Sequence, residues 1–417
     1  MRIETLCTGD ELLTGLTSDT NSRFFQALLL ERCGLTVARG TVVGDVAHEI
    51  EEALAAAAQR CDVLLVSGGL GPTADDLTAE CAARVAGVPL VEDAAVLAHL
   101  EARMQARGIA LTANNRRQAL VPRGAEVVLN AEGSAPLFVL KLGRCTAFFV
   151  PGVPREYRHL VEAHVVPRVA ALAPGQPVRV LRLLKTVGLP ESHLDARVKP
   201  LAEKYPRVTF GFRTHLPENH LKLLAEGATE AEAKATLAAA EAEARALLGD
   251  HVFGADDETL PGVVLDALKA RKEWLAVAES CTGGLICQLL TDVPGASEAL
   301  YGGAVAYANA AKSTWAQVPE GLIAQFGAVS EETAAALAQG VRTVAGTQWG
   351  LSTTGIAGPG GGTPTKPVGT VYIGVSSAAG TTVKRFQFHG DRERVRRFSG
   401  HAALDLLRLA LAARRTG

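Results

Sequence analysis

The stretch Asp62–Thr78 reads DVLLVSGGLGPTADDLT, and it decides the fold class. Its run VLLV is typical of a strand buried on both faces, and a glycine-rich segment then leads into a helical pattern over Asp76–Ala86. The residues before it alternate in the same way, with strands predicted at Arg2–Cys7 and Leu35–Val43 and helices at Asn21–Arg32 and His48–Arg60. This alternation predicts an α/β fold with a mostly parallel sheet covered on both faces.

The chain of 417 residues is too long for one ordinary core, so we expect two or three domains. A proline- and glycine-bearing linker at Ala171–Pro177 and a second boundary near Ala255 divide it. The ranges are 1–172, 173–254 and 255–417. The middle range predicts strand, helix, strand, strand and helix, and the last range alternates strands and helices again. Its predicted elements are helices at Leu260–Arg271, Gly284–Leu290 and Arg394–Ala413 and strands at Trp274–Ala278, Gly303–Tyr307, Leu351–Thr354, Val368–Ser376 and Thr382–Phe388.

Composition excludes several classes of protein. A net charge of -2 gives no global basic field for nucleic acid or anionic membrane. The first residues lack the charged and apolar regions of a signal peptide, and no apolar run approaches the roughly 20 residues of a membrane span. Seven scattered cysteines without a CxxC pair argue against disulfides and a thiolate zinc site. We therefore expect a cytoplasmic protein.

The glycine-rich segment after the VLLV strand carries a candidate anion site. Gly68, Gly69 and Gly71 let the backbone approach a phosphate, and Thr73 adds a hydroxyl before a helix N-terminus that favours negative charge. Parallel strands bring their following loops to one edge of the sheet, so carboxylates should gather there. The candidate ligands for Mg²⁺ or a similar divalent metal are Asp10, Asp45, Asp75 and Asp76. A helix-capping aspartate and plain turn glycines are the alternative reading of the same residues.

The last range contains LAVAESCTGGL over Leu275–Leu285, where a hydroxyl and a thiol stand side by side. A nucleophilic Cys281 would need a histidine or an electropositive setting, and nothing marks the nearby histidines as bases. Ser280 could instead use an amine base, and Lys312 is available, with Tyr307 to pass or position the proton. Backbone N–H groups around Cys281 to Gly284 are the candidate oxyanion donors. The alternative is that Ser280 caps a helix and Cys281 packs.

Two further segments could complete this site. The stretch Thr353–Gly369 is rich in glycine, and Thr354 could donate a hydroxyl there, although a surface loop fits the residues equally well. Arg392 and Arg396 are one helical turn apart and could clamp a 5′-phosphate, although a solvated basic helix end fits them too.

Five motifs in this order resemble one family. TGDELL, SGGLGPTADDLT, PGVPREY, AESCTGG and VAYANAAK are similar to the competence/damage-inducible CinA family over essentially the whole chain. The resemblance implies an N-terminal molybdopterin-binding-like (MoaB/MogA-like) domain, a small α+β KH-type module and a C-terminal α/β deamidase domain. It also implies hydrolysis of nicotinamide mononucleotide by the last domain, without a metal, and metal-dependent hydrolysis of ADP-ribose to AMP and ribose 5-phosphate by the first.

The resemblance also assigns roles to residues. Ser280 matches the nucleophile of the nicotinamide mononucleotide deamidases, with Tyr307 and Lys312 beside it, and Ala308 stands where many relatives have serine. The substrate-binding residues expected around them are Cys281, Thr282, Gly283, Gly284, Asn309, Thr354, Gly355, Gly358, Arg392 and Arg396.

Other functions remain as alternatives. A competence or recombination adaptor, or a molybdopterin-binding protein with little enzymatic activity, would fit the same family. A KH-type module raises nucleic-acid binding, but residues 178–253 contain no GxxG loop, so we do not expect it. A homodimer is expected from the family resemblance alone.

Overall fold

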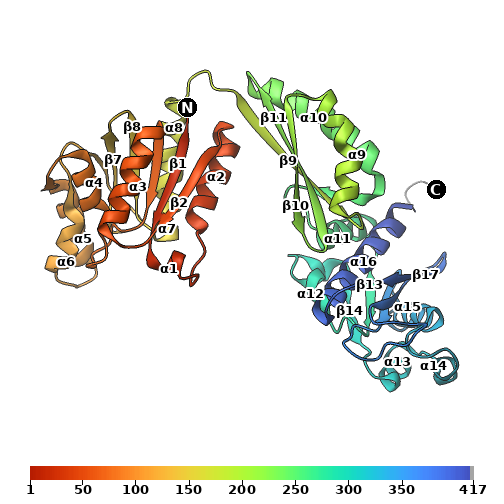
Figure 1. Cartoon of the computed structure of the whole chain (residues 1–417). Coiled ribbons are helices and arrows are strands. Elements are labelled where there is room, and N and C mark those ends of the chain that lie inside the picture. Colours follow the sequence, from red (N-terminus) through yellow and green to blue (C-terminus); the bar gives the residue numbers. More distant parts are fainter. Residues whose placement is uncertain (414–417) are drawn as a thin grey trace. The chain divides into compact units, whose positions relative to one another are not determined.

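The computed structural model describes residues 1–413, which form α/β domains at both ends of the chain and a smaller α+β module between them (Figure 1). Contacts within the chain define two compact units. One contains Met1–Leu181 with Ala225–Thr236, and the other contains Arg182–Leu224 with the residues from Leu237 onward.

The N-terminal domain contains a six-stranded sheet in the order β2-β1-β3-β8-β7-β6, in which the first four strands are parallel. The last two strands pair antiparallel, as does the small ribbon of β4 and β5. The elements are β1 Ile3–Thr8, α1 Asp10–Leu13, α2 Thr20–Cys33, β2 Val37–Val43, α3 Ala47–Arg60, β3 Val63–Ser67, α4 Thr78–Ala86, β4 Leu90–Glu92, α5 Ala94–Ala106, α6 Ala113–Arg116, η1 Arg117–Ala119, β5 Leu120–Pro122, β6 Glu126–Val128, β7 Leu137–Leu142, β8 Cys145–Val150, α7 Pro154–Leu160, η2 Val161–Val165 and α8 Val166–Ala171.

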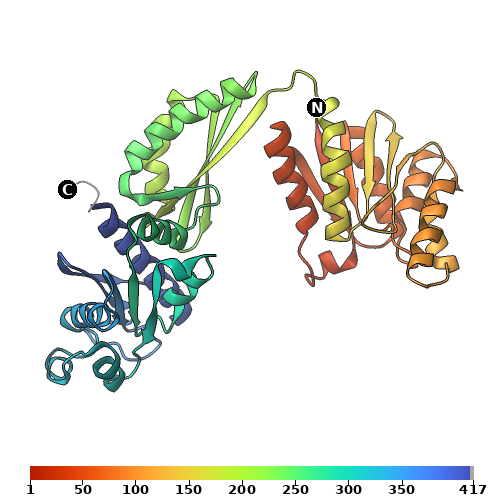
Figure 2. The same ribbon diagram turned by 180° about the vertical axis from the view of Figure 1, so that it is seen from behind.

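Strand β3 explains why this domain has two helical layers. Leu64 and Val66 pack with α3 and α4 on one face of the sheet, which faces the viewer in Figure 1. Val63 and Leu65 pack with α2, α7 and α8 on the other face, seen in Figure 2. Because successive side chains of a strand point to opposite faces, an uninterrupted apolar run requires a cover on both sides.

The middle module begins with the predicted strand, helix, strand, strand and helix and ends with a strand that was not predicted, β12, which pairs antiparallel with β9. The elements are β9 Val178–Val187, α9 Glu191–Lys204, β10 Val208–His215, β11 Glu218–Gly227, α10 Glu230–Leu248, η3 Gly249–His251 and β12 Val252–Ala255. Its sheet runs β10-β11-β9-β12. The expected linker lies between α8 and β9, where residues 172–177 belong to no helix or strand.

The C-terminal domain contains a five-stranded sheet in the order β14-β13-β15-β16-β17. Strand β13 pairs parallel with β14 and β15, and the remaining pairs are antiparallel. Helices α11, α12 and α16 cover one face, and α13, α14 and α15 cover the other. The elements are α11 Leu260–Arg271, β13 Leu275–Glu279, α12 Leu285–Thr291, η4 Ala296–Glu298, β14 Leu300–Val305, α13 Asn309–Ala316, α14 Glu320–Phe326, α15 Glu331–Ala345, β15 Trp349–Gly355, β16 Thr370–Ser377, β17 Gly380–Gln387 and α16 Arg392–Ala413.

Two predicted elements differ from the structure at residues that matter for the sites. The helix expected from Asp76 begins at Thr78, because Asp76 folds the preceding loop through its own hydrogen bonds. The strand expected at Gly303–Tyr307 is β14, Leu300–Val305, so Tyr307 lies beyond it. Gly302 and Gly303 in the middle of β14 weaken its strand pattern, so the predicted strand begins and ends later than the observed one.

Candidate functional sites

The chain turns sharply between β13 and α12, and this turn carries Ser280. Ser280 is the first residue after β13, and its N–H donates to the Thr353 carbonyl on the neighbouring strand β15 at 3.0 Å. Gly283 and Gly284 have φ angles of 61° and 94°, in the left-handed region that favours glycine. The glycines therefore let the chain reverse within a few residues and bring the serine to the carboxyl edge of the sheet.

Lys312 lies on α13, and its side chain reaches Ser280. Its Nζ lies 3.2 Å from Ser280 Oγ and 3.0 Å from each of the main-chain oxygens of Ala306 and Tyr307. The side chain is 1% exposed, and burial lowers the pKa of Lys312 from its ordinary value. Desolvation disfavours the ammonium form, so the neutral amine is more accessible here than on the surface.

The three contacts of Lys312 define where its lone pair points. The two carbonyl oxygens can only accept, so two N–H bonds of the amine must be directed at them. In the neutral amine the remaining tetrahedral position, which faces Ser280 Oγ, is a lone pair. The geometry therefore places a proton acceptor on the serine hydroxyl whenever Lys312 is neutral.

Cys281 lies in a different environment from its neighbour. It is buried among core residues, and this burial, together with the Glu279 carboxylate, raises the pKa of its thiol to about 12. At neutral pH the group is a thiol, and only a thiolate is an effective nucleophile. These properties favour Ser280 over Cys281 as the attacking group.

Tyr307 contacts the site in two ways. Its carbonyl oxygen holds Lys312 Nζ, whereas its phenol oxygen accepts a hydrogen bond from an Arg392 Nη at 2.7 Å. The other Nη of Arg392 donates to the Gly358 carbonyl at 2.8 Å. The phenol thus lies beside the arginine, and the main chain of Tyr307 performs the positioning that we expected from its ring.

These groups line a cavity of about 280 Å³ in the C-terminal domain. Nine of the residues expected at this site are on its wall. They are Ser280, Cys281, Tyr307, Asn309, Lys312, Thr354, Gly355, Gly358 and Arg392. Four more wall residues lie in the glycine-rich stretch Thr353–Gly369 that the sequence singled out, namely Ile356, Ala357, Gly360 and Gly361. Sequence reasoning missed Ala328 and Val329, which lie between α14 and α15 in a segment without a distinctive motif.

Four expected residues support the turn and do not line the cavity. Arg396 donates through Nε and Nη2 to the Thr282 carbonyl at 3.2 and 2.8 Å, so its charge is directed at the turn and not into a phosphate clamp with Arg392. The Thr282 hydroxyl lies 2.7 Å from that of Thr353. Gly283 and Gly284 make the bend itself.

Two further expectations are corrected by hydrogen bonds within the fold. The Thr354 hydroxyl donates to the Ala328 carbonyl at 2.6 Å, so its proton is not available to a ligand. The N–H groups of Gly283 and Gly284 donate to the Ser280 carbonyl and the Glu279 carboxylate, which removes them as oxyanion donors. Within the described chain, the N–H groups of Cys281 and Thr282 donate to no carbonyl or carboxylate oxygen.

The N-terminal domain has its own candidate site at the loop after β3. Gly68 and Gly69 have φ angles of 106° and 63°, and a Cβ on Gly69 would lie 2.1 Å from Thr78 Oγ1. One oxygen of Asp76 accepts from the Gly71 N–H at 2.7 Å, and the other accepts from the N–H and the hydroxyl of Thr73. Asp76 therefore shapes the loop and does not cap α4, whose first residues receive no side-chain cap, so the capping alternative is wrong.

The other carboxylates converge, as we expected for loops at one sheet edge. The N–H of Asp10 donates to the Asp45 carboxylate and the N–H of Asp45 to the Asp10 carboxylate, both at 3.1 Å. Burial raises the pKa of Asp45, and the carboxylates of Asp10, Glu11 and Asp75 raise it further. The Thr73 hydroxyl lowers the pKa of Asp75, which is exposed.

These residues fit a divalent metal only in part. Residues 1–413 contain no group of three or more His, Cys, Asp or Glu side chains arranged to hold a metal ion. Both oxygens of Asp76 are engaged, so the four expected ligands do not form one set. Asp45 and Asp75 could still contribute one oxygen each, which suits Mg²⁺, since it is often held by one or two carboxylates together with substrate phosphates.

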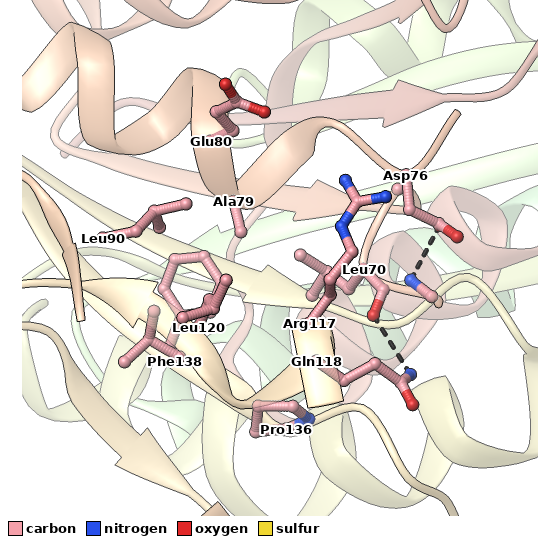
Figure 3. A pocket seen from close by; sticks show the side chains of 13 residues that line it. Leu70, Asp76, Ala79, Glu80, Leu90, Arg117, Gln118, Leu120, Pro136 and Phe138 are labelled. Atoms are coloured by element: carbon pink, nitrogen blue, oxygen red, sulfur yellow. Dashed lines mark hydrogen bonds between the residues drawn. The ribbon is translucent and has the colours of Figure 1, made fainter. Parts of the chain in front are cut away.

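Two cavities adjoin at this loop. A polar cavity of about 370 Å³ is lined by all three glycines of the loop and by Glu11, Asp45, Asp75 and Asp76. Beside it, a smaller cavity of about 270 Å³ is lined by apolar side chains, among them Leu90, Leu120 and Phe138, and by the polar side chains of Asp76, Glu80, Arg117 and Gln118 (Figure 3). The residues common to both walls are Gly69, Leu70, Gly71, Asp76 and Gln118.

The three parts of the chain each match a family model. Residues 4–171 match a probable molybdopterin binding domain, residues 181–254 the KH domain of damage-inducible protein CinA, and residues 257–411 the CinA C-terminal domain. The described structure is thus a three-part α/β protein of the kind that these models define.

Relatives cover the chain from end to end. A CinA-like protein of Myxococcus xanthus is 54% identical over 417 residues, which is 99% of each chain. One of an Anaeromyxobacter species is 48% identical over 413 residues, again 99% of each chain. A solved CinA structure from Thermoplasma acidophilum is 31% identical and covers 41% of this chain and 99% of its own, with a TM-score of 0.38. The chain belongs to the CinA family.

The structure also contains no helix within residues 1–413 whose length and apolar character would let it cross a membrane.

Proposed function

We propose that the C-terminal domain hydrolyses the carboxamide of nicotinamide mononucleotide to nicotinate mononucleotide and ammonia. The observation that supports this most directly is the Lys312 amine, buried and 3.2 Å from Ser280 Oγ with two of its protons committed to carbonyls. A serine paired with a neutral lysine is an established arrangement for acyl transfer. A carboxamide is an acyl group whose leaving group is ammonia.

The reaction follows from the positions of these groups. Ser280 Oγ attacks the carboxamide carbon while its proton passes to Lys312 Nζ. The C–N bond then breaks, and the lysine returns the proton to the departing ammonia. A water molecule, deprotonated by the same amine, attacks the acyl-serine, and the Ser280 Oγ–carbonyl bond breaks. The serine takes back the proton, and nicotinate mononucleotide leaves.

The remaining wall residues have binding roles in this proposal. Arg392 contributes positive charge to the cavity and would attract the 5′-phosphate. The N–H groups of Cys281 and Thr282 are the turn's remaining candidates for the oxyanion, because those of Gly283 and Gly284 are engaged elsewhere. No metal is required for these steps.

The decisive experiment measures ammonia release from nicotinamide mononucleotide by the purified full chain. Ser280→Ala should abolish release, whereas Cys281→Ala should retain it. Release that survives Ser280→Ala and disappears in Cys281→Ala would overturn the assignment of the nucleophile. A wild-type chain that releases no ammonia would overturn the substrate.

We also propose a second activity, the metal-dependent hydrolysis of ADP-ribose to AMP and ribose 5-phosphate in the N-terminal domain. The two adjoining cavities support it, because a dinucleotide-like ligand needs one place for its diphosphate and another for its base. Leu90 and Leu120 on the wall of the smaller cavity offer apolar surface for an adenine ring, and the glycine loop offers close backbone approach for phosphates. A divalent metal held near Asp45 and Asp75 would neutralise the diphosphate charge.

This second proposal is tested by incubating the chain with ADP-ribose and a divalent cation. AMP should appear with Mg²⁺ and not with a chelator. Leu120→Ala should raise the KM for ADP-ribose without changing ammonia release, since Leu120 is only half-buried and the two sites are in different domains. AMP formation that is unaffected by chelator would remove the metal from the proposal.

A molybdopterin-binding protein or an adaptor without activity remains the alternative for this family. In its favour, the N-terminal model that matches is a molybdopterin binding domain. Failure of both assays would favour it. We further propose a homodimer in the cytoplasm that does not bind nucleic acid. Sedimentation would test the homodimer, and a filter-binding assay with single-stranded DNA and RNA would test the lack of nucleic-acid binding.

A further inference from the structure

Glu279 is a buried acidic residue beside the proposed nucleophile. It is the last residue of β13, it is 1% exposed, and Ser280 follows it directly. One carboxylate oxygen accepts from the N–H groups of Gly284 and Ile286 at 2.9 and 3.1 Å, and the other accepts from the Cys287 N–H at 2.9 Å. All three donors belong to the start of α12.

These bonds close the turn that carries the serine. The first N–H groups of a helix have no partner within the helix, and a carboxylate satisfies them with charge-assisted bonds. Glu279 stands before the turn and its three donors stand after it. The carboxylate therefore connects the two ends of the segment Ser280–Gly284. We call these three hydrogen bonds of Glu279 the clasp.

The clasp acts together with contacts that hold the middle of the turn. Thr353 on β15 accepts the Ser280 N–H through its carbonyl and contacts the Thr282 hydroxyl through its own. The Arg396 guanidinium holds the Thr282 carbonyl from α16. Of these three partners, Glu279 is the one that joins β13 to the start of α12.

We infer that Glu279 is the positioning residue of this site: its carboxylate fixes the turn so that Ser280 Oγ stays opposite Lys312 Nζ. Glu279 is absent from the cavity wall, so it acts through Ser280 and not on the substrate. It also withdraws the Gly284 N–H from the oxyanion, which leaves that role to the earlier part of the turn. The inference rests on the proposed amidase function for its kinetic consequence, but not for the contacts themselves.

Glu279→Gln tests the inference, because the amide keeps the shape of the side chain but presents an NH₂ group to one set of N–H donors. The turn should loosen, and a misplacement near 1 Å costs on the order of 100-fold in rate. We expect kcat for ammonia release to fall about 100-fold while KM stays within about twofold, since the cavity wall is intact. Gln288→Ala is the matched control: it lies on the same helix, its side chain is exposed, and the change should leave kcat within about twofold.

Hydrogen exchange of residues 280–291 in the full chain gives a reading that needs no activity. The amides of Gly284, Ile286 and Cys287 should exchange about tenfold faster in Glu279→Gln than in the wild type or Gln288→Ala. Unchanged exchange would overturn the contacts, and faster exchange with an unchanged kcat would overturn the positioning role. A KM that rises as far as kcat falls would also overturn it, since it would mean a disordered cavity.

The same measurements separate this inference from the proposed substrate. If the wild type releases no ammonia but exchange accelerates in the variant, the substrate proposal fails and the clasp stands. Should Glu279→Gln not fold, Glu279→Asp carries the test, because it keeps the charge but withdraws the oxygens by one methylene. It should give the same split between kcat and KM, and wild-type values in this variant would contradict the inference.

Discussion

The two end domains use the same local design for different purposes. In each, a buried strand ends in a glycine-containing turn that leads into a helix, and a carboxylate accepts backbone N–H groups near that turn. Asp76 lies inside its loop and folds the loop on itself, whereas Glu279 stands before its turn and holds the helix beyond it. The first arrangement leaves exposed backbone beside acidic side chains, and the second holds one hydroxyl against one amine.

This difference indicates what each site can do. A loop folded on itself at the mouth of two cavities can accept an anionic ligand and a metal. A turn whose two ends are held by hydrogen bonds, with the buried Lys312 in contact with its serine, is suited to a covalent step in which the reacting atoms can be displaced only slightly. Both turns contain glycines, so the position of the carboxylate relative to its turn is what distinguishes the two sites.

The largest effect should come from removing the amine. Lys312→Met keeps the length and apolar stem of the side chain but has no proton acceptor, so kcat for ammonia release should fall about 10³-fold. Lys312→Arg should fall nearly as far, because a guanidinium stays charged and cannot act as a base. AMP formation from ADP-ribose by the same protein is the internal control. Activity in Lys312→Arg close to that of the wild type would contradict a base at this position.

Lowering the pH should reduce the rate of ammonia release by about tenfold per pH unit and should affect AMP formation only in more acidic solution. The neutral form of Lys312 is the active one, so ammonia release should rise with pH until it passes the lysine pKa, which burial places below the ordinary value. The pKa of Asp45 is raised but starts from 3.8, so the N-terminal site should lose its carboxylate charge only in more acidic solution. Rates of both reactions measured across the same pH series provide the check. If the rates of the two reactions changed with pH in the same way, the assignment of Lys312 as the base would be contradicted.

The arginines of α16 should differ from one another. Arg392→Ala should raise the KM for nicotinamide mononucleotide about tenfold, because it removes the charge on the cavity wall. Arg396→Ala should instead lower kcat by a similar factor, because it releases the Thr282 carbonyl. Arg394, whose guanidinium lies over the Phe398 ring at 5.0 Å, is the matched control on the same helix. Steady-state kinetics of the three variants distinguishes them. Equal increases in KM for Arg392→Ala and Arg396→Ala would support a phosphate clamp formed by both arginines.

The smallest effect should come from the N-terminal loop. Asp76→Ala leaves the N–H groups of Gly71 and Thr73 without their acceptor, which should lower the free energy of unfolding of this domain by about 1–2 kcal/mol. Denaturant titration followed by a probe in the N-terminal domain measures it. Asp75→Ala is the control, because Asp75 is exposed and should change stability little while still weakening metal binding. The reverse order of the two effects would show that Asp75 shapes the loop.

Much of the architecture could be predicted because it follows local patterns. The VLLV run is apolar on both faces and required two helical layers, and the order of elements from β9 to α10 in the middle module followed from its periodicity. The start of β14 could not be predicted, because Gly302 and Gly303 obscure its pattern. Helix α15 was not predicted either, although its cap Ser330 and the helical spacing of its buried Leu337 and Val341 could have indicated it.

For the sites, the sequence alone determined which chemistry was available: a serine and a lysine in one domain, and a glycine loop with carboxylates in the other. Only the tertiary structure decided how those groups are used. It directed Arg396 at Thr282, engaged the Thr354 hydroxyl with Ala328, and turned the Gly284 N–H towards Glu279. Each of these is a contact between segments that the sequence keeps separate or a turn geometry that it leaves open. The direction of a hydrogen bond depends on distances and angles that residue type does not specify.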